Sequence, residues 1–215
     1  MIIAVGHTKG GVGKSTIAVQ LATYLKAVKH IERVWVIDTD PQKSCSKSLI
    51  DRNSLEQLAP ISCATYSDCK ELLQQIKANK SMWEHIIIDV GGRDSNTFRT
   101  ALMLADLLLV PVVPRAYDLD AVNDLYLLLE GVWGLGSEIK ANAFLSCADS
   151  QGSANQDAVD YIQQFKDITM IDAPVHRRKA IGIASTKGLS VFEDSPKDQK
   201  ACDEIERLVN TIFKE

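Results

Sequence analysis

Apolar and polar positions divide this chain into two kinds of segment that alternate along its length. Runs of consecutive apolar residues are typical of parallel strands covered on both faces, whereas apolar residues recurring every three or four positions are typical of helices. Strands are predicted at residues 2–5, 34–37, 60–64, 85–89, 107–114, 141–146 and, as the last one, 168–171. Helices are predicted at residues 17–25, 44–58, 68–77, 95–105, 119–129, 156–165 and 196–213. The alternation predicts an α/β fold, a doubly wound and mostly parallel sheet with helices on both faces.

Length and charge limit the domain count and the partners. The chain has 215 residues, of which 46% are hydrophobic, enough to bury the core of one domain and few for two. We therefore expect a single domain over residues 1–215. The formal net charge of −4 provides no overall positive field that would attract nucleic acid, so such a contact would need a local basic patch.

Cysteine usage and hydropathy bear on the cellular location. The five cysteines are odd in number and lack CxxC spacing, which argues against a disulfide framework or a structural zinc site. Cys63 and Cys69 could still pair or bind a metal, the alternative being that they are small buried hydrophobes. The first strand starts directly after Met1, so no signal peptide is expected, and no apolar run reaches the roughly 18 residues of a membrane span. We expect a soluble, cytoplasmic protein.

A glycine-rich segment connects the first predicted strand to the first predicted helix. Its glycines allow positive φ and turn backbone N–H groups inward, so that these donors and the positive end of the helix face a phosphate. Lys14 can then reach the terminal phosphates and the Ser15 hydroxyl can bind Mg²⁺. The nucleotide-binding residues expected here are Lys9, Gly10, Gly11, Val12, Gly13, Lys14, Ser15 and Thr16.

This segment departs from the usual phosphate-loop pattern GxxxxGK[ST] in two ways. Thr8 stands where the pattern has its first glycine, and a second lysine, Lys9, lies at the loop entrance. The alternative interpretation is a glycine-rich turn with unrelated lysines, which the flanking strand and helix argue against.

Acidic residues follow two further strands. Asp38 and Asp40 come after residues 34–37, and Asp89 ends the strand at 85–89. Because ligands collect at the carboxyl ends of parallel strands, these carboxylates should lie beside the phosphate loop, where they can support Mg²⁺ through its water shell or orient an attacking water. The alternative for Asp38 and Asp40 is that they only cap the next helix.

Other features carry less specific signals. Gly91 and Gly92 can form a loop that moves with a γ-phosphate, or an ordinary strand-end turn. Asp149 follows a strand and can touch a base or ribose, or remain solvated. A basic cluster at residues 174–179, with Lys187, is either a phosphate-binding patch or a solvated turn.

The final predicted helix carries an apolar stripe formed by Ile205, Leu208, Val209, Ile212 and Phe213. A membrane-surface role would favour a polar face rich in lysine and arginine, but this one is mixed in charge. Packing of the stripe on the sheet is therefore expected.

In motif order, the chain resembles the deviant Walker-type ATPases of the ParA and MinD group. The resemblance rests on residues 9–16 as the modified phosphate loop, 38–42 as a first switch and 86–92 as a second. It is greatest to short partition ATPases without an N-terminal helix-turn-helix, and residues 110–115 and 188–193 also resemble that subgroup. Gly91-Gly92-Arg93 departs from the frequent double proline of the second switch.

The resemblance implies a slow ATPase that uses ATP/ADP and Mg²⁺ and forms an ATP-dependent homodimer. Lys9 would reach the phosphates bound by the other subunit, Lys14 would bind β- and γ-phosphates, and Asp40 would position the attacking water. Ser15, Asp38 and Asp89 would support the metal. The dimer would bind nucleoid DNA without sequence preference and would not bind a membrane. A ParB-type adaptor would stimulate hydrolysis and so release the protein from DNA. The DNA-contact candidates are Arg177, Arg178, Lys179 and Lys187, with Lys197 and Lys200 as further ones.

Three alternative functions share this fold. A MinD-like regulator of the division site would need a membrane-binding tail, and a positioner of protein cargo would differ only in its adaptor. A metabolic or metal-cluster enzyme is the third, although residues 89–105 contain no cysteine for a cluster.

Overall fold

A parallel sheet forms the centre of the molecule. The computed structural model describes residues 1–92, 94–151 and 153–213, without the side chains of residues 116–119; Arg93 lies outside the described residues. The strands are β1 Ile2–Val5, β2 Val34–Asp38, β3 Ser62–Thr65, β4 His85–Asp89, β5 Leu107–Val112, β6 Lys140–Ala148, β7 Ile168–Met170 and β8 Val175–His176. Within the described ranges they form one eight-stranded sheet in the order β3-β2-β4-β1-β5-β6-β7, with β8 beside β6. Each pairing between these strands is parallel.

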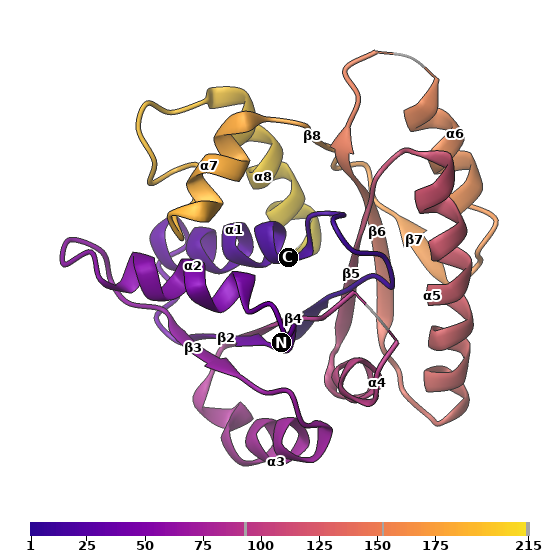
Figure 1. The fold of residues 1–215 in the computed structure, drawn as a ribbon, viewed down its shortest axis with the longest axis horizontal. Coiled ribbons are helices and arrows are strands. Elements are labelled where there is room, and N and C mark those ends of the chain that lie inside the picture. The colour runs from indigo at the N-terminus through magenta and orange to yellow at the C-terminus, as the bar shows by residue number, and fades with distance from the viewer. Residues whose placement is uncertain (93, 152, 214–215) are drawn as a thin grey trace.

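Helices cover both faces of this sheet (Figure 1). They are α1 Lys14–Ala27, α2 Ser44–Asn53, α3 Cys69–Asn79, α4 Asn96–Leu104, α5 Ala116–Gly134, α6 Ala154–Ile162, α7 Lys179–Thr186 and α8 Gln199–Ile212, with a short 3₁₀ turn at Lys80–Met82. In Figure 1, α1, α2, α7 and α8 lie on one side and α3, α4, α5 and α6 on the other. The predicted doubly wound α/β fold is confirmed.

The alternation of side chains along each strand explains why two separate cores form. In β1, Ile3 and Val5 belong to the apolar cluster that contains Leu208 of α8. Ile2 and Ala4, which point the other way, belong to the cluster that contains Phe98 of α4. A strand between two helical layers needs apolar residues on both faces, which is why these strands appear as unbroken apolar runs.

The apolar stripe of α8 packs against the sheet, as predicted. Ile205, Leu208 and Val209 are each at most 2% exposed, and Ile212 and Phe213 pack at the margin of the same cluster. In the described ranges, no helix combines the length and apolarity needed to cross a bilayer.

The structure corrects the prediction in four places. The helix predicted at 44–58 ends at Asn53, and α5 extends beyond both ends of the predicted 119–129. The strand at 168–171 is not the last one, because β8 pairs with β6 further along the chain. Part of the predicted basic turn is instead the start of α7.

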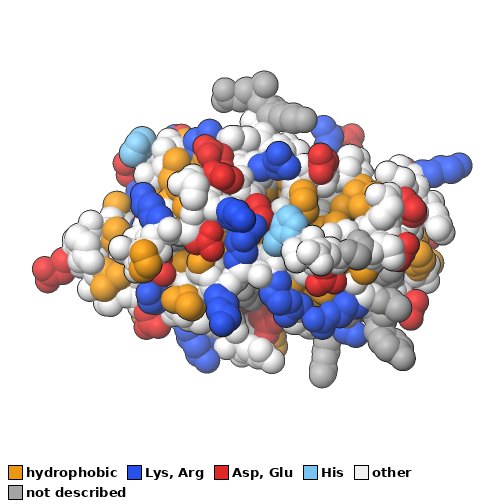
Figure 2. All heavy atoms as spheres, turned by 90° about the horizontal axis from the view of Figure 1, so that it is seen from above, with side chains coloured by type: hydrophobic (Ala, Val, Ile, Leu, Met, Phe, Trp, Pro, Cys, Tyr) orange, Lys and Arg blue, Asp and Glu red, His pale blue; other side chains and the backbone are white. Residues whose placement is uncertain are grey.

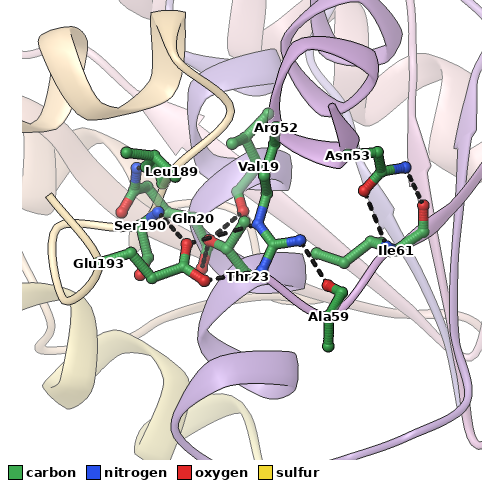
Figure 3. A network of polar contacts seen from close by, with 10 residues as sticks. All are labelled: Val19, Gln20, Thr23, Arg52, Asn53, Ala59, Ile61, Leu189, Ser190 and Glu193. Carbon is green, nitrogen blue, oxygen red and sulfur yellow. Dashed lines mark hydrogen bonds and ion pairs between the residues drawn. The ribbon is translucent and has the colours of Figure 1, made fainter. Parts of the chain in front are cut away.

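A buried polar network holds α2 to the segment before α8 (Figure 3). Arg52 Nη2 lies 2.7 Å from Glu193 Oε1, and the Glu193 carboxylate also accepts the Ser190 N–H at 2.9 Å. The Gln20 side chain of α1 contacts the same segment, donating to the Leu189 carbonyl and accepting the Val191 N–H. The first helix, α2 and the 188–193 segment are therefore held together by polar contacts as well as by the core.

Candidate functional site

Three neighbouring strands bring their carboxyl ends to one place. In the register of the sheet, Val5 of β1 lies opposite Asp89 of β4, and Asp89 lies opposite Asp38 of β2. The chain leaves β1 directly into the glycine-rich loop, so the two carboxylates stand beside that loop. The sheet therefore places the acids of the sequence prediction next to the predicted phosphate loop, as the parallel topology requires.

The loop has the backbone conformation that its glycines permit. Gly11 and Gly13 have φ of 77° and 98°, in the left-handed region. Gly13 precedes α1 and provides no side-chain cap, so the first N–H groups of α1 remain available to a ligand. A helix N-terminus of this kind, preceded by a glycine loop, favours anions.

Lys14 is the first residue of α1 and is 6% exposed. Its Nζ donates to the Lys9 carbonyl at 2.9 Å, so the lysine lies folded over the loop. Burial lowers the pKa of Lys14, and the nearby carboxylates of Asp89 and Asp40 partly offset that shift. An anion placed in the loop would further favour the charged amine.

Asp38 and Asp40 differ in how many of their carboxylate oxygens accept hydrogen bonds. Both oxygens of Asp38 accept backbone N–H groups, from Asp40 at 3.0 Å and from Ser46 at 2.8 Å, and the residue is 1% exposed. Asp40 is only partly buried and accepts one N–H, from Gln42 at 2.8 Å. The local-cap interpretation thus accounts for the contacts of Asp38, whereas Asp40 retains an oxygen that can turn toward a ligand.

Asp89 has an unusual environment for a carboxylate. It is fully buried, and neither oxygen accepts a hydrogen bond of good geometry from the residues the structure describes. Burial raises its pKa to about 7, with Asp38 and Asp40 adding to the rise and the Ser15 hydroxyl and Lys14 opposing it. A divalent cation near Ser15 would favour the ionised form of this carboxylate.

Gly91 and Gly92 pack directly on the site. A Cβ at Gly92 would lie 3.1 Å from Lys14 Nζ and 3.2 Å from Gly10 Cα, and one at Gly91 would lie 3.6 Å from Asp40 Cα. The segment that follows β4 therefore contacts both the phosphate loop and the loop after β2. A ligand that displaces the Lys14 side chain would therefore also change the contacts of Gly92.

Three residues whose contacts the sequence did not predict shape the loop. The Thr8 hydroxyl donates to the Ala121 carbonyl of α5 at 2.8 Å, and buried His7 accepts the Lys9 N–H at 3.0 Å. The Ser146 hydroxyl at the end of β6 donates to the Val12 carbonyl at 2.8 Å. Ser146 had one detectable signal, because it is a polar residue at the carboxyl end of an apolar strand.

The basic cluster is partly neutralised by the chain itself. Arg178 forms an ion pair with Glu204 at 2.6 Å, and Lys187 forms one with Asp194 at 2.8 Å. Arg177 and Lys179 are exposed and have no ion pair among the described residues. Figure 2 shows Lys and Arg side chains gathered near the middle of the face seen from above.

Asp149 and the cysteines differ in their exposure to solvent. The Asp149 backbone contacts the Asn155 side chain, and Asp149 is exposed. All five cysteines are free, with Cys45 and Cys202 buried. Within the described residues, no group of three or more His, Cys, Asp or Glu side chains could hold a metal ion by itself.

Comparison with known proteins places the fold and loop in one family. The family model described as the CobQ/CobB/MinD/ParA nucleotide binding domain matches residues 3–214. The chain belongs to this family, and the predicted resemblance to its ParA and MinD members is confirmed.

Individual relatives and solved structures are similar to nearly the whole chain. Maintenance of carboxysome distribution protein A of Halothiobacillus neapolitanus is 26% identical over 212 residues, covering 98% of this chain and 95% of the relative. The fold is similar to that of a Cyanothece McdA–ATP complex, with a TM-score of 0.73, 17% identity and coverage of 98% and 95%. It is also similar to the septum site-determining protein MinD of Pyrococcus horikoshii with Mg-ADP, with a TM-score of 0.74, 17% identity and coverage of 99% and 96%.

Proposed function

We propose that this chain is an ATPase that partitions DNA, in which ATP binding joins two copies into a DNA-binding dimer and hydrolysis releases them. The observation that carries the proposal is the convergence of Lys14, Asp40 and Asp89 on a loop with two left-handed glycines, in a chain of the MinD/ParA family. An anion-binding loop with acids at its rim suits a nucleotide triphosphate bound together with a cation.

The donor set fits Mg²⁺ held mainly by phosphate and water. Ser15 would supply a hydroxyl ligand, and Asp38 and Asp89 would act on the water shell, because both Asp38 oxygens already accept backbone N–H groups. The cation would neutralise phosphate charge, and Lys14 would hold the β- and γ-phosphates. Asp40, with one oxygen not engaged by Gln42, would orient the attacking water.

In this proposal Lys9 acts across the dimer. Replacing Lys9 with alanine should leave ADP affinity within about threefold, since ADP is held by the subunit's own loop, but reduce ATP-dependent dimerisation by more than about tenfold. Light scattering with a slowly hydrolysed ATP analogue measures this, with exposed Lys47→Ala as the matched control. A Lys9→Ala protein that dimerises like Lys47→Ala would remove the trans role of this lysine.

DNA binding is assigned here to Arg177 and Lys179, because Arg178 and Lys187 are paired with acids. Reversing both charges, Arg177→Glu with Lys179→Glu, should weaken ATP-dependent DNA binding at least about tenfold and reduce its salt dependence, while basal hydrolysis stays unchanged. A gel shift with nonspecific duplex DNA at several salt concentrations provides the measurement.

The matched control changes equal charge at the opposite end of the sheet. Lys140 begins β6 and Lys166 precedes β7, and both are exposed. Lys140→Glu with Lys166→Glu should retain DNA binding within about twofold. Equal losses in the two double variants would show an effect of net charge alone and would contradict the patch.

Positioning of protein cargo is the second function, favoured by similarity to a carboxysome distribution protein over 98% of this chain. Both functions would use the same ATP and DNA cycle and differ in the adaptor. Deleting the gene in its host distinguishes them: DNA partition predicts loss of plasmids or chromosomes from daughter cells, whereas cargo positioning predicts clustering of a protein body.

A further inference from the structure

A buried serine 134 residues further along the chain contacts the phosphate loop. Ser146, at the carboxyl end of β6, is 3% exposed, and its Oγ donates to the Val12 carbonyl at 2.8 Å. Val12 itself is 1% exposed, so its carbonyl needs a donor from within the protein. The hydroxyl of Ser146 is that donor.

The backbone around Ser146 is locally irregular. Cys147, the next residue, has φ of 51° in the left-handed region, which a non-glycine residue adopts at a cost in free energy. The pairing of β6 with β8 also shifts register between Ser146 and Ala148. A bulge of this kind redirects the side chains beside it and is common next to active sites.

The contact determines the direction of one peptide group in the loop. In a trans peptide the C=O and the following N–H point in opposite directions, so a Val12 carbonyl held by Ser146 turns the Gly13 N–H away from β6. Among the described residues, no backbone hydrogen bond uses that N–H. It therefore remains a donor directed to the side opposite Ser146.

The absence of a side chain at Gly13 leaves room for the same contact. A Cβ at Gly13 would lie 2.9 Å from Ser146 Oγ, and its φ of 98° also disfavours any side chain. The serine hydroxyl occupies the space that a larger residue at position 13 would need. Ser146 and Gly13 thus form one packed unit at the start of α1.

We propose that Ser146 is a positioning residue for nucleotide phosphate: through the Val12 carbonyl, it aims the Gly13 N–H at the phosphate bound in the loop. This inference rests on the proposed ATP-binding function of the same loop. Among the described residues, the Ser146 hydroxyl donates to the Val12 carbonyl, and the left-handed backbone of Cys147 lies directly after it.

The test compares Ser146→Ala with the hydroxyl-retaining Ser146→Thr. Losing the hydroxyl frees the peptide to rotate, so Ser146→Ala should bind fluorescent ADP with Mg²⁺ about tenfold more weakly, whereas Ser146→Thr should stay within about threefold of the unmodified chain. Ser190→Ala is the matched control, because Ser190 is fully buried and its hydroxyl makes no hydrogen bond with described residues. If Ser146→Ala does not fold, Ser146→Cys, a weak donor of similar size, replaces it.

A second readout separates positioning from stability. In ¹⁵N-labelled protein the Gly13 amide resonance should move strongly when ADP and Mg²⁺ bind, and this shift should shrink in Ser146→Ala even where saturation is reached. Normal affinity in Ser146→Ala, or equal losses in Ser146→Thr or Ser190→Ala, would overturn the inference while leaving the ATPase proposal intact. Failure of the unmodified chain to bind ADP or ATP would instead refute the ATPase proposal.

Discussion

Replacing Lys14 with alanine is expected to weaken ATP binding by at least about 100-fold and ADP binding by at least about tenfold. The Nζ of Lys14 donates to the Lys9 carbonyl at the mouth of the loop, within the influence of Asp89 and Asp40. Without this cation, the subunit's own phosphate loop would offer the phosphates backbone donors but no positively charged side chain beside the carboxylates. Each charge-assisted hydrogen bond is worth about 1.5–3 kcal/mol. ATP would lose the contacts to two phosphates, whereas ADP, which has no γ-phosphate, would lose the contact to one.

Lys26 provides the control for this prediction within the same helix. Its side chain is 8% exposed and pairs with Glu32 at 2.6 Å, far along α1 from the loop. Lys26→Ala should therefore bind fluorescent ADP like the unmodified chain in an equilibrium titration. An ADP affinity of Lys14→Ala equal to that of Lys26→Ala would show that the loop does not bind phosphate through Lys14.

The sequence predicted the central strands well because their constraint is local. A strand buried on both faces must be apolar throughout, so β1, β2, β4 and β5 could be recognised without knowing their neighbours. The same topology placed Asp38 and Asp89 together, since parallel strands end at one edge of the sheet. The site acids followed from this rule.

The missed features depend on contacts between distant segments. The strand β8 has only two residues, Val175–His176, too few to show an apolar run or an alternation, and it is defined by its pairing with β6. Arg178 was read as a DNA contact, but the structure also pairs it with Glu204 from α8, 26 residues away. The hydrogen bond of Ser146 to Val12 spans 134 residues, and no local pattern encodes it.

The end of α2 is likewise determined by contacts that a local sequence pattern does not show. Residues beyond Asn53 retain a mixed pattern that suits a helix, yet the chain turns there and its Ala59 carbonyl accepts Arg52 Nη1 at 2.7 Å. Arg52 is 1% exposed and also pairs with Glu193, whose side chain is 7% exposed (Figure 3). The guanidinium thus bridges the turn after α2 and the segment before α8.

Arg52→Ala is expected to lower the free energy of unfolding by about 3–5 kcal/mol, because it leaves the buried Glu193 carboxylate without its counter-charge. For a chain of this size the melting temperature should fall by roughly 10 °C. Chemical denaturation followed by circular dichroism measures the first quantity and calorimetry the second. Nucleotide affinity measured well below the melting temperature should change little, since Arg52 does not contact the loop.

Two control variants separate the effect of leaving a buried carboxylate unpaired from the effect of losing any arginine. Arg99 pairs with Asp94 through two hydrogen bonds, but both side chains are about half exposed, so Arg99→Ala should cost less than about 1 kcal/mol. The double variant Arg52→Met with Glu193→Leu removes both charges and should recover most of the stability lost in Arg52→Ala, since buried pairs replaced by apolar residues are often neutral. If Arg52→Ala costs no more than Arg99→Ala, the pair does not hold α2 to the C-terminal segment. If the double variant is as unstable as Arg52→Ala, the hydrogen bonds of this pair to the Ala59 carbonyl and the Ser190 N–H, rather than charge compensation, carry the stabilisation.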